Sequence, residues 1–390
     1  MFQIYLSLVT MIPFSYSRLA HVDALRGFAL FGILLANLPY DKNSAVLTVS
    51  DRTFEFFFHL LIDKKLITIF SILFGFGFFM QMHKAEREGL HFPKYFLIRM
   101  ILLFAIGSLH AYGLWFGDII RAYAFGGLCM LFVYSWPIKR LLWLALFFNI
   151  ILTSVIFIGN AALDWQSYQY DPKLAEELPI AKSFGRYLYL NFTIDPWRNF
   201  LQDMPLTLSF AFGNMLLGMI LGRTGFFHHT ASMRKFKSRI ILIGFTVGVA
   251  GSFVFYLLQA GKLEMNLSLI WLPFVLVVCM LAQSLGYISL FFWLFNKKRV
   301  NGLLRVFIPV GQMALTNYVM QSLLYLLVFF HCTHLTSLFG KVGLTSTFFI
   351  GLLFFAFQLW LSQFYLKKFK QGPLEKAWRM LTQRLTALPG

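Results

Sequence analysis

The sequence predicts an all-α membrane protein, a polytopic bundle of about ten transmembrane helices with both termini in the cytoplasm. The first observation is composition: hydrophobic residues make up 58% of the 390, aromatic residues 19% and charged residues only 13%. An ordinary soluble domain has roughly 25% charged residues. The second observation is the repetition of long apolar runs, and the third is the distribution of charge between them. Together they exclude a soluble globular domain.

Ten apolar stretches are long enough to cross a bilayer as helices, for which about 20 mostly apolar residues are needed. They lie at about residues 20–40, 62–82, 96–116, 119–136, 138–159, 205–222, 239–260, 267–295, 306–331 and 343–366. The bundle is therefore expected over residues 18–366. Residues 1–14 are apolar but short, begin without basic residues and show no clear cleavage site. We interpret residues 1–17 as an N-terminal extension.

The connections between the predicted spans alternate in charge. Most of the 34 basic residues lie in one set of connections, while the opposite set holds basic and acidic residues in similar numbers. Basic loops remain in the cytoplasm, which places both termini inside and predicts a location in the plasma (inner) membrane. The net charge of +18 is then a topology signal with an attraction to anionic lipid. Nucleic-acid binding is not expected, and the oligomeric state stays open.

The first span, residues 18–40, contains Asp23, Arg26 and Asn37 within apolar sequence. Charge inside a membrane segment is costly and normally faces a protein interior or a wet cavity. We therefore expect this helix inside the bundle, beside a site. Asp23 and Arg26 lie toward the cytoplasm, and either form a structural ion pair or contribute to a phosphate site.

Residues 99–127 hold the densest group of polar residues within apolar sequence. His110 lies late in the third span, and Gly117-Asp118 predicts a tight outer turn. Asp118 suits the N-cap of the fourth helix, with Arg121 placed to neutralise it. His110 and Asp118 touch only if the turn folds the chain back. His110 and Asp118 are then candidate catalytic residues, with His110 as the base; the alternatives are a hydrogen-bonded core histidine and an Asp118 that is only an N-cap.

Two further segments carry expectations. The long connection 160–204 is rich in aromatic and acidic residues and predicts short helices over the extracytoplasmic face. In the ninth span Asn317 and Gln321 share a face, which predicts an inward polar stripe that contacts substrate.

The last segment, residues 367–390, predicts a cytoplasmic amphipathic tail with Leu374, Trp378 and Leu381 on one side and basic residues around them. Such a helix either caps the bundle or lies on the inner leaflet.

The remaining metal and thiol candidates are weak. Cys129, Cys279 and Cys332 have no paired spacing, so neither a disulfide framework nor a zinc site is expected. His331 and His334 lie three residues apart, but a lone pair does not define a metal site. No metal is expected.

Five stretches resemble the YeiB-like bacterial membrane proteins, classed as domain of unknown function 418. They are RLAHVDALRGFALFGILLAN (18–37), FSILFGFGF (70–78), GSLHAYGLWFGDII (107–120), GQMALTNYVMQS (311–322) and GPLEKAWRMLT (372–382). The family is similar in outline to a wider group of transmembrane acyltransferases, which also carry an aspartate and an arginine-glycine pair in the first span. Asp23 and Arg26-Gly27 match these positions.

The resemblance implies an acyl-CoA donor bound from the cytoplasm, near Asp23 and Arg26, and an acceptor met on the outer side. Many bacterial members of the wider group place a catalytic histidine where this chain has Asn37. Here His59 or His110 would have to supply the base, or His59 contacts substrate. An amide such as Asn37 suits stabilisation of the oxyanion.

Two other classes of function stay open. A small-solute transporter would also have many spans, buried polar groups and a polar stripe. A non-catalytic assembly or signalling protein would use the amphipathic tail. The sequence does not identify an acyl donor or an acceptor.

Overall fold

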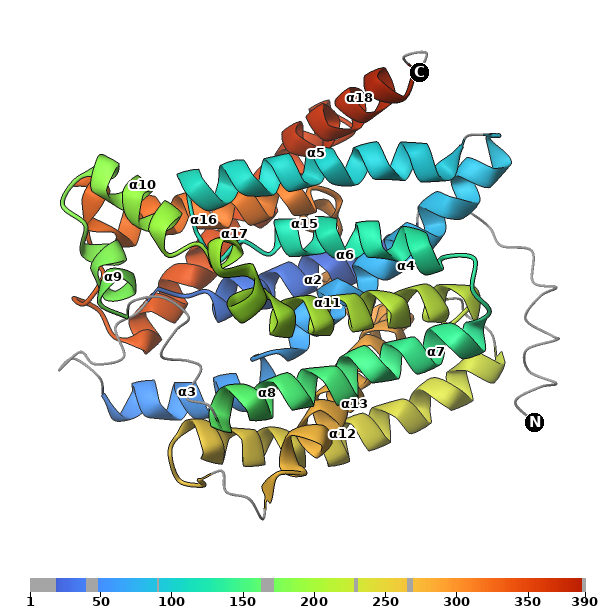
Figure 1. The fold of residues 1–390 in the computed structure, drawn as a ribbon, viewed down its shortest axis with the longest axis horizontal. Helices are drawn as coiled ribbons and strands as arrows, with labels where there is room; N and C mark the ends of the chain where they lie inside the picture. Colours follow the sequence, from blue (N-terminus) through green and yellow to red (C-terminus); the bar gives the residue numbers. More distant parts are fainter. Residues whose placement is uncertain are drawn as a thin grey trace.

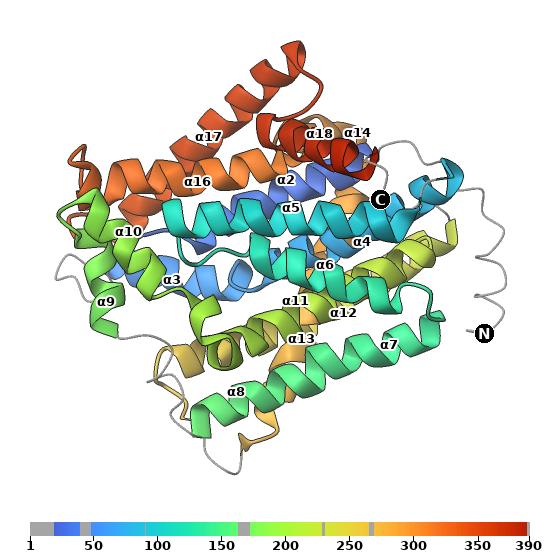
Figure 2. The same cartoon turned by 45° about the horizontal axis from the view of Figure 1, so that its top comes forward.

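The structure is a computed structural model that describes residues 19–39, 48–89, 91–162, 172–227, 231–264 and 269–387. Within these ranges the regular structure is helical and no strand is present. The predicted extension 1–17 and residues 40–47, after the first predicted span, lie outside the described residues. The long helices run side by side as a bundle, seen from two directions in Figure 1 and Figure 2.

The helices follow one another in chain order. The first half contains α2 (Ala20–Ala36), α3 (Val49–Leu61), α4 (Lys65–Arg87), α5 (Phe92–Gly113), α6 (Ile120–Val133), α7 (Ile138–Leu146) and, after a π-helical turn, α8 (Thr153–Ala162). The second half contains α9 (Pro172–Glu177), α10 (Phe184–Thr193), α11 (Phe200–Arg223), α12 (Ala231–Gln259), α13 (Leu272–Phe295), α14 (Lys298–Arg305), α15 (Ile308–Gln312), α16 (Ala314–Phe329), α17 (Leu344–Lys368) and α18 (Pro373–Ala387).

Seven helical stretches in the described residues are long and apolar enough to cross a membrane. They are Val49–Arg87, Phe92–Gly113, Ile138–Gly159, Met204–Arg223, Arg234–Gln259, Leu272–Phe295 and Leu344–Lys368. Two apolar helices, α6 and α16, are shorter. The all-helical, multi-span architecture is as predicted, while the number of about ten spans and the cytoplasmic termini stay predictions.

Helix α2 lies inside the bundle. Twelve of its 17 residues are buried, and it contacts α4, α13, α15, α16 and α17. Its backbone meets α15 directly, because a Cβ added at Gly27 would lie 2.1 Å from the Phe307 carbonyl oxygen. A Cβ at Gly311 would lie 1.8 Å from the Asp23 carbonyl oxygen. The glycine of the arginine-glycine pair therefore permits this close approach.

The second predicted span, 62–82, begins at a break between α3 and α4. Lys64 adopts the left-handed conformation there, with φ 62°. The last carbonyls of α3 are bonded by side chains: Lys65 Nζ donates to the His59 carbonyl at 2.6 Å, and Gln283 of α13 donates to the Leu60 carbonyl at 3.0 Å. These bonds satisfy backbone groups that a helix end leaves without partners. Because α13 lies far along the chain, the local sequence does not predict the break.

The two outlying segments cover the bundle. The described part of the long connection forms α9, α10 and short 3-10 turns at the left end in Figure 1. The tail forms α18, which packs beside α5. Leu374 and Trp378 of α18 are partly buried and Thr382 is fully buried, whereas Leu381 is 46% exposed. The buried side of the tail therefore follows a spacing of four residues and leaves out Leu381.

Candidate functional site

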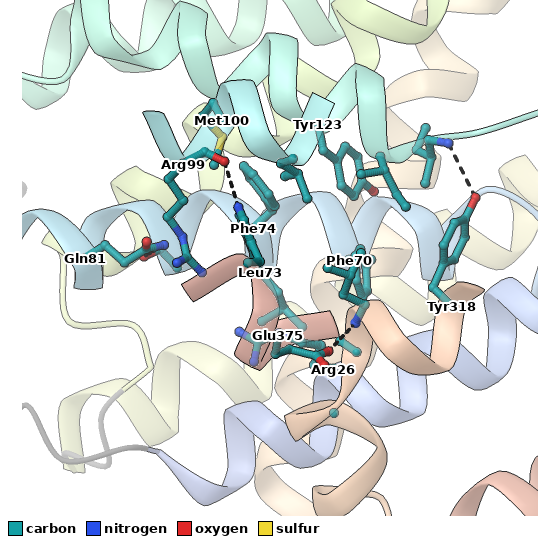
Figure 3. A pocket seen from close by; sticks show the side chains of 18 of the residues that line it. Arg26, Phe70, Leu73, Phe74, Gln81, Arg99, Met100, Tyr123, Tyr318 and Glu375 are labelled. Carbon is teal, nitrogen blue, oxygen red and sulfur yellow. Dashed lines mark hydrogen bonds between the residues drawn. The ribbon is translucent and has the colours of Figure 1, made fainter. Parts of the chain in front are cut away.

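A cavity of about 250 Å³ lies between α4, α5, α6, α16 and α18 (Figure 3). Most of its wall is apolar. Polar side chains gather at its two ends: Arg26, Gln81, Arg99 and Glu375 at one, and Tyr123 and Tyr318 at the other. The cavity therefore has a charged end, an apolar middle and a phenolic end.

At the charged end, α2 contributes the predicted acidic and basic pair. Arg26 Nη1 donates to Asp23 Oδ1 at 3.0 Å, and Gln312 Nε2 donates to Asp23 Oδ2 at 3.4 Å. Asp23 is buried, while the Arg26 side chain is 24% exposed and lines the cavity. A structural ion pair and a phosphate site are therefore compatible roles, because Arg26 is paired with Asp23 and also lines the cavity.

The tail helix covers this end. Glu375 Oε1 accepts the Leu315 and Thr316 backbone amides at 2.7 and 3.1 Å, which caps the start of α16. Trp378 Nε1 donates to the Arg99 carbonyl at 2.8 Å, and the Arg99 guanidinium lies 3.6 Å above the Trp378 ring. Sequence reasoning missed Arg99 and Glu375, although the amphipathic pattern around Trp378 pointed to a packed tail.

A second pocket, of about 380 Å³, continues from the charged end and shares Gln81 with the first. Its lining includes four basic side chains, Lys84, His91, Lys94 and Arg379, and one acidic side chain, Glu88. The charged side chains of the second pocket are mostly basic, and this pocket borders the charged end of the first at Gln81.

Beyond the phenolic end, His110 and Asp118 are in contact. His110 Nδ1 lies 2.8 Å from Asp118 Oδ2, and the two side chains are 1% and 0% exposed. The turn at Gly117 does fold the chain back. Because an ionised carboxylate only accepts hydrogen bonds, Nδ1 donates and fixes the tautomer of the neutral ring. His110 Nε2 is left to accept, and Ser322 Oγ lies 2.9 Å from it.

Asp118 is held by Arg121 and by the close packing of α5. Asp118 Oδ1 accepts the Arg121 backbone amide at 2.9 Å, as an N-cap would, and lies 3.5 Å from Arg121 Nε. A Cβ added at Gly107 of α5 would lie 2.9 Å from the same oxygen. The carboxylate therefore sits in a fitted space between α5 and α6.

The main partner of Arg121 is Asp195, which sequence reasoning missed. Arg121 Nη1 and Nη2 donate to Asp195 Oδ2 and Oδ1, each at 2.8 Å. Asp195 lies in the long connection, 74 residues away along the chain, so no local spacing points to it. This fully buried pair ties the connection 160–204 to the His110 region.

Tyr318 lies between the cavity and His110. Its ring lines the cavity, and its centroid is 5.1 Å from that of the His110 ring. The Tyr318 hydroxyl accepts the Ile119 amide at 3.4 Å. The phenolic end of the cavity and the His110 group therefore share one wall.

The other predicted site residues lie elsewhere. Asn37 ends α2, is exposed, and makes no hydrogen bond to His110 or Asp118 within the described residues. His59 Nδ1 lies 3.0 Å from Asp63 Oδ2, at the break between α3 and α4. Neither Asn37 nor His59 lines the cavity.

The polar stripe on α16 turns inward and is bonded within the protein. Asn317 Nδ2 lies 3.0 Å from Ser362 Oγ, and Gln321 Nε2 donates to the Leu30 carbonyl and to Gln358 Oε1. Neither Asn317 nor Gln321 lines the cavity. This arrangement joins α2, α16 and α17. Across the ranges that the structure describes, no group of three or more metal-ligating side chains is present.

Comparison with known proteins finds one matching family model and several similar proteins. Residues 221–385 match the family model described as "Protein of unknown function (DUF418)". The chain is 29% identical over 401 residues to the uncharacterized protein YxaH of Bacillus subtilis (strain 168), covering 94% of each chain. It is 28% identical over 397 residues to the uncharacterized protein YeiB of Escherichia coli (strain K12), covering 93% of this chain and 96% of YeiB. No solved structure is significantly similar to the chain. The matches confirm the resemblance to the YeiB-like DUF418 proteins that the sequence motifs predicted.

Proposed function

We propose that this multi-pass membrane protein is an acyltransferase that moves an acyl group from cytoplasmic acyl-CoA to an acceptor reached from the opposite side of the membrane. The observation that carries the proposal is the buried His110–Asp118 pair behind a cavity whose other end is basic. The resemblance to transmembrane acyltransferases in the first span supports the same reading. The plasma membrane is the proposed location.

The donor end consists of Arg26 and Arg99, with the basic pocket beside Gln81. Guanidinium groups bind phosphate oxygens through directed hydrogen bonds, so these side chains suit the phosphates of CoA. Arg99 and His110 are about 16 Å apart along α5, at 1.5 Å per residue. The flexible arm of CoA that carries the thioester has to cover this distance through the apolar middle of the cavity.

The reactive end depends on the tautomer of His110. With Nδ1 bonded to Asp118, Nε2 is the atom that accepts a proton as the thioester is attacked. Burial of the pair keeps water away from a reactive thioester. Asn37 stays a proposal for stabilisation of the oxyanion, although it is exposed at the end of α2 and, like His110, does not line the cavity.

Thermal stability in detergent tests the donor site. A ligand present at 100 times its Kd stabilises the folded state by about 2.7 kcal/mol, so acyl-CoA is expected to raise Tm. Arg26→Ala and Arg99→Ala are expected to remove most of this rise, whereas Arg186→Ala keeps it, because Arg186 lies in the exposed outer connection. A wild-type Tm that no acyl-CoA changes would contradict the proposal.

A second function, solute transport, is favoured by one observation. The break between α3 and α4 lies within a single long apolar stretch, and the Lys65 side chain beside it is fully buried. Interrupted helices line substrate sites in many transporters. Solute uptake into proteoliposomes, together with an unchanged Tm in acyl-CoA, would support this function over acyl transfer.

A further inference from the structure

We propose that Ser322 is the nucleophile of the transfer, so that the acyl group passes through an ester on this protein. The proposal rests on the acyl transfer proposed above and deepens it. Ser322 of α16, His110 of α5 and Asp118 of the turn before α6 form one hydrogen-bonded line, with distances of 2.9 and 2.8 Å. The three groups have the types and the order of a serine–histidine–aspartate triad.

Ser322 bonds across helices, as Ser252 and Ser362 do with Gln283 and Asn317, whereas several other serines bond to their own helix. Ser71, Ser108 and Ser284 each donate to the carbonyl four residues earlier on their own helix, at 2.9, 3.0 and 2.8 Å. This local bond is the usual one for a helical serine. In the part of the chain that the structure describes, the Ser322 hydroxyl bonds to His110 instead. Its proton is therefore directed at the atom that accepts it.

Ser322 lies beside a residue that lines the cavity, although neither Ser322 nor His110 lines it. Tyr318 precedes Ser322 by four residues, so the two side chains lie on one face of α16. Tyr318 lines the cavity at the end opposite Arg99 (Figure 3), and Ser322 is only partly buried. Because the Tyr318 oxygen already accepts the Ile119 amide, its own proton can be donated to the oxygen that becomes negative in the transition state.

The reaction balances without another reagent. Ser322 Oγ forms a bond to the thioester carbon as its proton moves to His110 Nε2. The carbon–sulfur bond breaks, and the thiolate takes that proton and leaves as free CoA. The acceptor hydroxyl or amine then attacks the Ser322 ester, gives its proton to His110, and Ser322 Oγ recovers a proton as it leaves. Asp118 acts as a positioning residue that holds the ring.

Trapping of the ester tests the inference. Purified protein in detergent is mixed with a short-chain acyl-CoA that is radiolabelled in the acyl group, without acceptor, and is quenched in acid. We expect label on the peptide that contains Ser322. Ser322→Ala is expected to reduce the label to background and the transfer rate by at least about 10³-fold. Ser108→Ala, on the same helix as His110, is expected to keep both.

Ser322→Cys separates a chemical role from a structural one. This variant is expected to hold the label as a thioester, which neutral hydroxylamine releases, whereas the wild-type ester resists it. Transfer by Ser322→Ala at the wild-type rate, or transfer by the wild type with no label on Ser322, would overturn the inference and leave the acyltransferase proposal standing.

Absence of both transfer and stabilisation by acyl-CoA would instead refute the proposed function. A fluorophosphonate probe then tests Ser322 alone, because the probe needs an activated serine and no acyl donor. Modification of Ser322 that is lost in His110→Asn supports an activated nucleophile. An unmodified Ser322 in the wild type overturns it.

Discussion

The buried pair between Arg121 and Asp195 allows a stability prediction with a defined magnitude. The two side chains share two hydrogen bonds of 2.8 Å and are 1% and 0% exposed. Asp195→Asn keeps the shape but removes the charge and directs an amide N–H group at the guanidinium. Breaking a buried pair in this way costs about 3–5 kcal/mol, because one charge remains buried without its partner. Asp118, 3.5 Å from Arg121 Nε, compensates in part, so we expect about 3 kcal/mol.

Thermal unfolding in detergent measures this cost. With an unfolding entropy of about 2.1 cal/mol/K per residue, a loss of about 3 kcal/mol lowers Tm by about 4 °C for a chain of this length. The matched control is Glu177→Gln. Arg186 holds the pKa of Glu177 below its usual range through a hydrogen bond, but this second bidentate pair is exposed, with side-chain exposures of 41% and 37%. We expect no measurable change in Tm for Glu177→Gln.

A double variant separates the desolvation cost from the shape of the site. Arg121→Met combined with Asp195→Leu removes both charges, and replacement of a buried pair by apolar residues is often neutral in stability. We therefore expect the double variant to be more stable than Asp195→Asn alone, which is a non-additive result. Equal losses of Tm for Asp195→Asn and Glu177→Gln, or a double variant less stable than the single one, would refute the reasoning.

Three further predictions concern close packing, the tail and the histidine site. Gly27→Ala places a Cβ 2.1 Å from the Phe307 carbonyl oxygen, and we expect this overpacking to lower the free energy of unfolding by about 1–3 kcal/mol. Gly77→Ala is the control, because its added Cβ meets no atom within 4 Å, and its Tm is expected to be unchanged or higher. A lower Tm for Gly77→Ala than for Gly27→Ala would contradict this prediction. Glu375→Ala removes three hydrogen bonds to the start of α16, so we expect faster proteolysis of the tail. Lys376→Ala is the control and is expected to leave the rate of proteolysis unchanged. Equal cleavage of the two variants would argue against the cap. Gly107→Ala places a Cβ 2.9 Å from Asp118 Oδ1, and we expect it to lower the transfer rate while acyl-CoA still raises Tm. Gly113→Ala is the control, because its added Cβ meets no atom within 4 Å, and its transfer rate is expected to be normal.

The sequence predicted those parts of the fold that depend on local pattern. Apolar runs located most helices, and the polar residues of the first span correctly placed α2 inside the bundle. Pairings between distant segments were not predictable. Ser322 bonds to a histidine 212 residues earlier, and Asp195 pairs with an arginine 74 residues earlier. No period or motif in a single sequence connects such positions, because their contact depends on how the helices pack.

The candidate site was predicted in part for the same reason. His110 and Asp118 are separated by one short turn, so their contact was foreseeable from Gly117. The resemblance implies a role for Asn37 at the same site from its place near the end of the first span. That argument fixes depth in the membrane but not the position around the bundle axis, and Asn37 lies exposed at the end of α2.

Helices α5 and α16 each reach from the charged end of the cavity toward the His110 group, and the tail contacts both of them. Helix α5 carries Arg99 and His110, and α16 begins at the charged end and carries Ser322 deeper in the bundle. Glu375 caps α16, and Trp378 bonds to the backbone of α5 at Arg99. A displacement of α18 therefore changes the charged end of the cavity and also releases restraints on both helices that carry the proposed catalytic groups, His110 and Ser322. This coupling accounts for the specific polar contacts between the tail and the bundle, which apolar packing alone would not require.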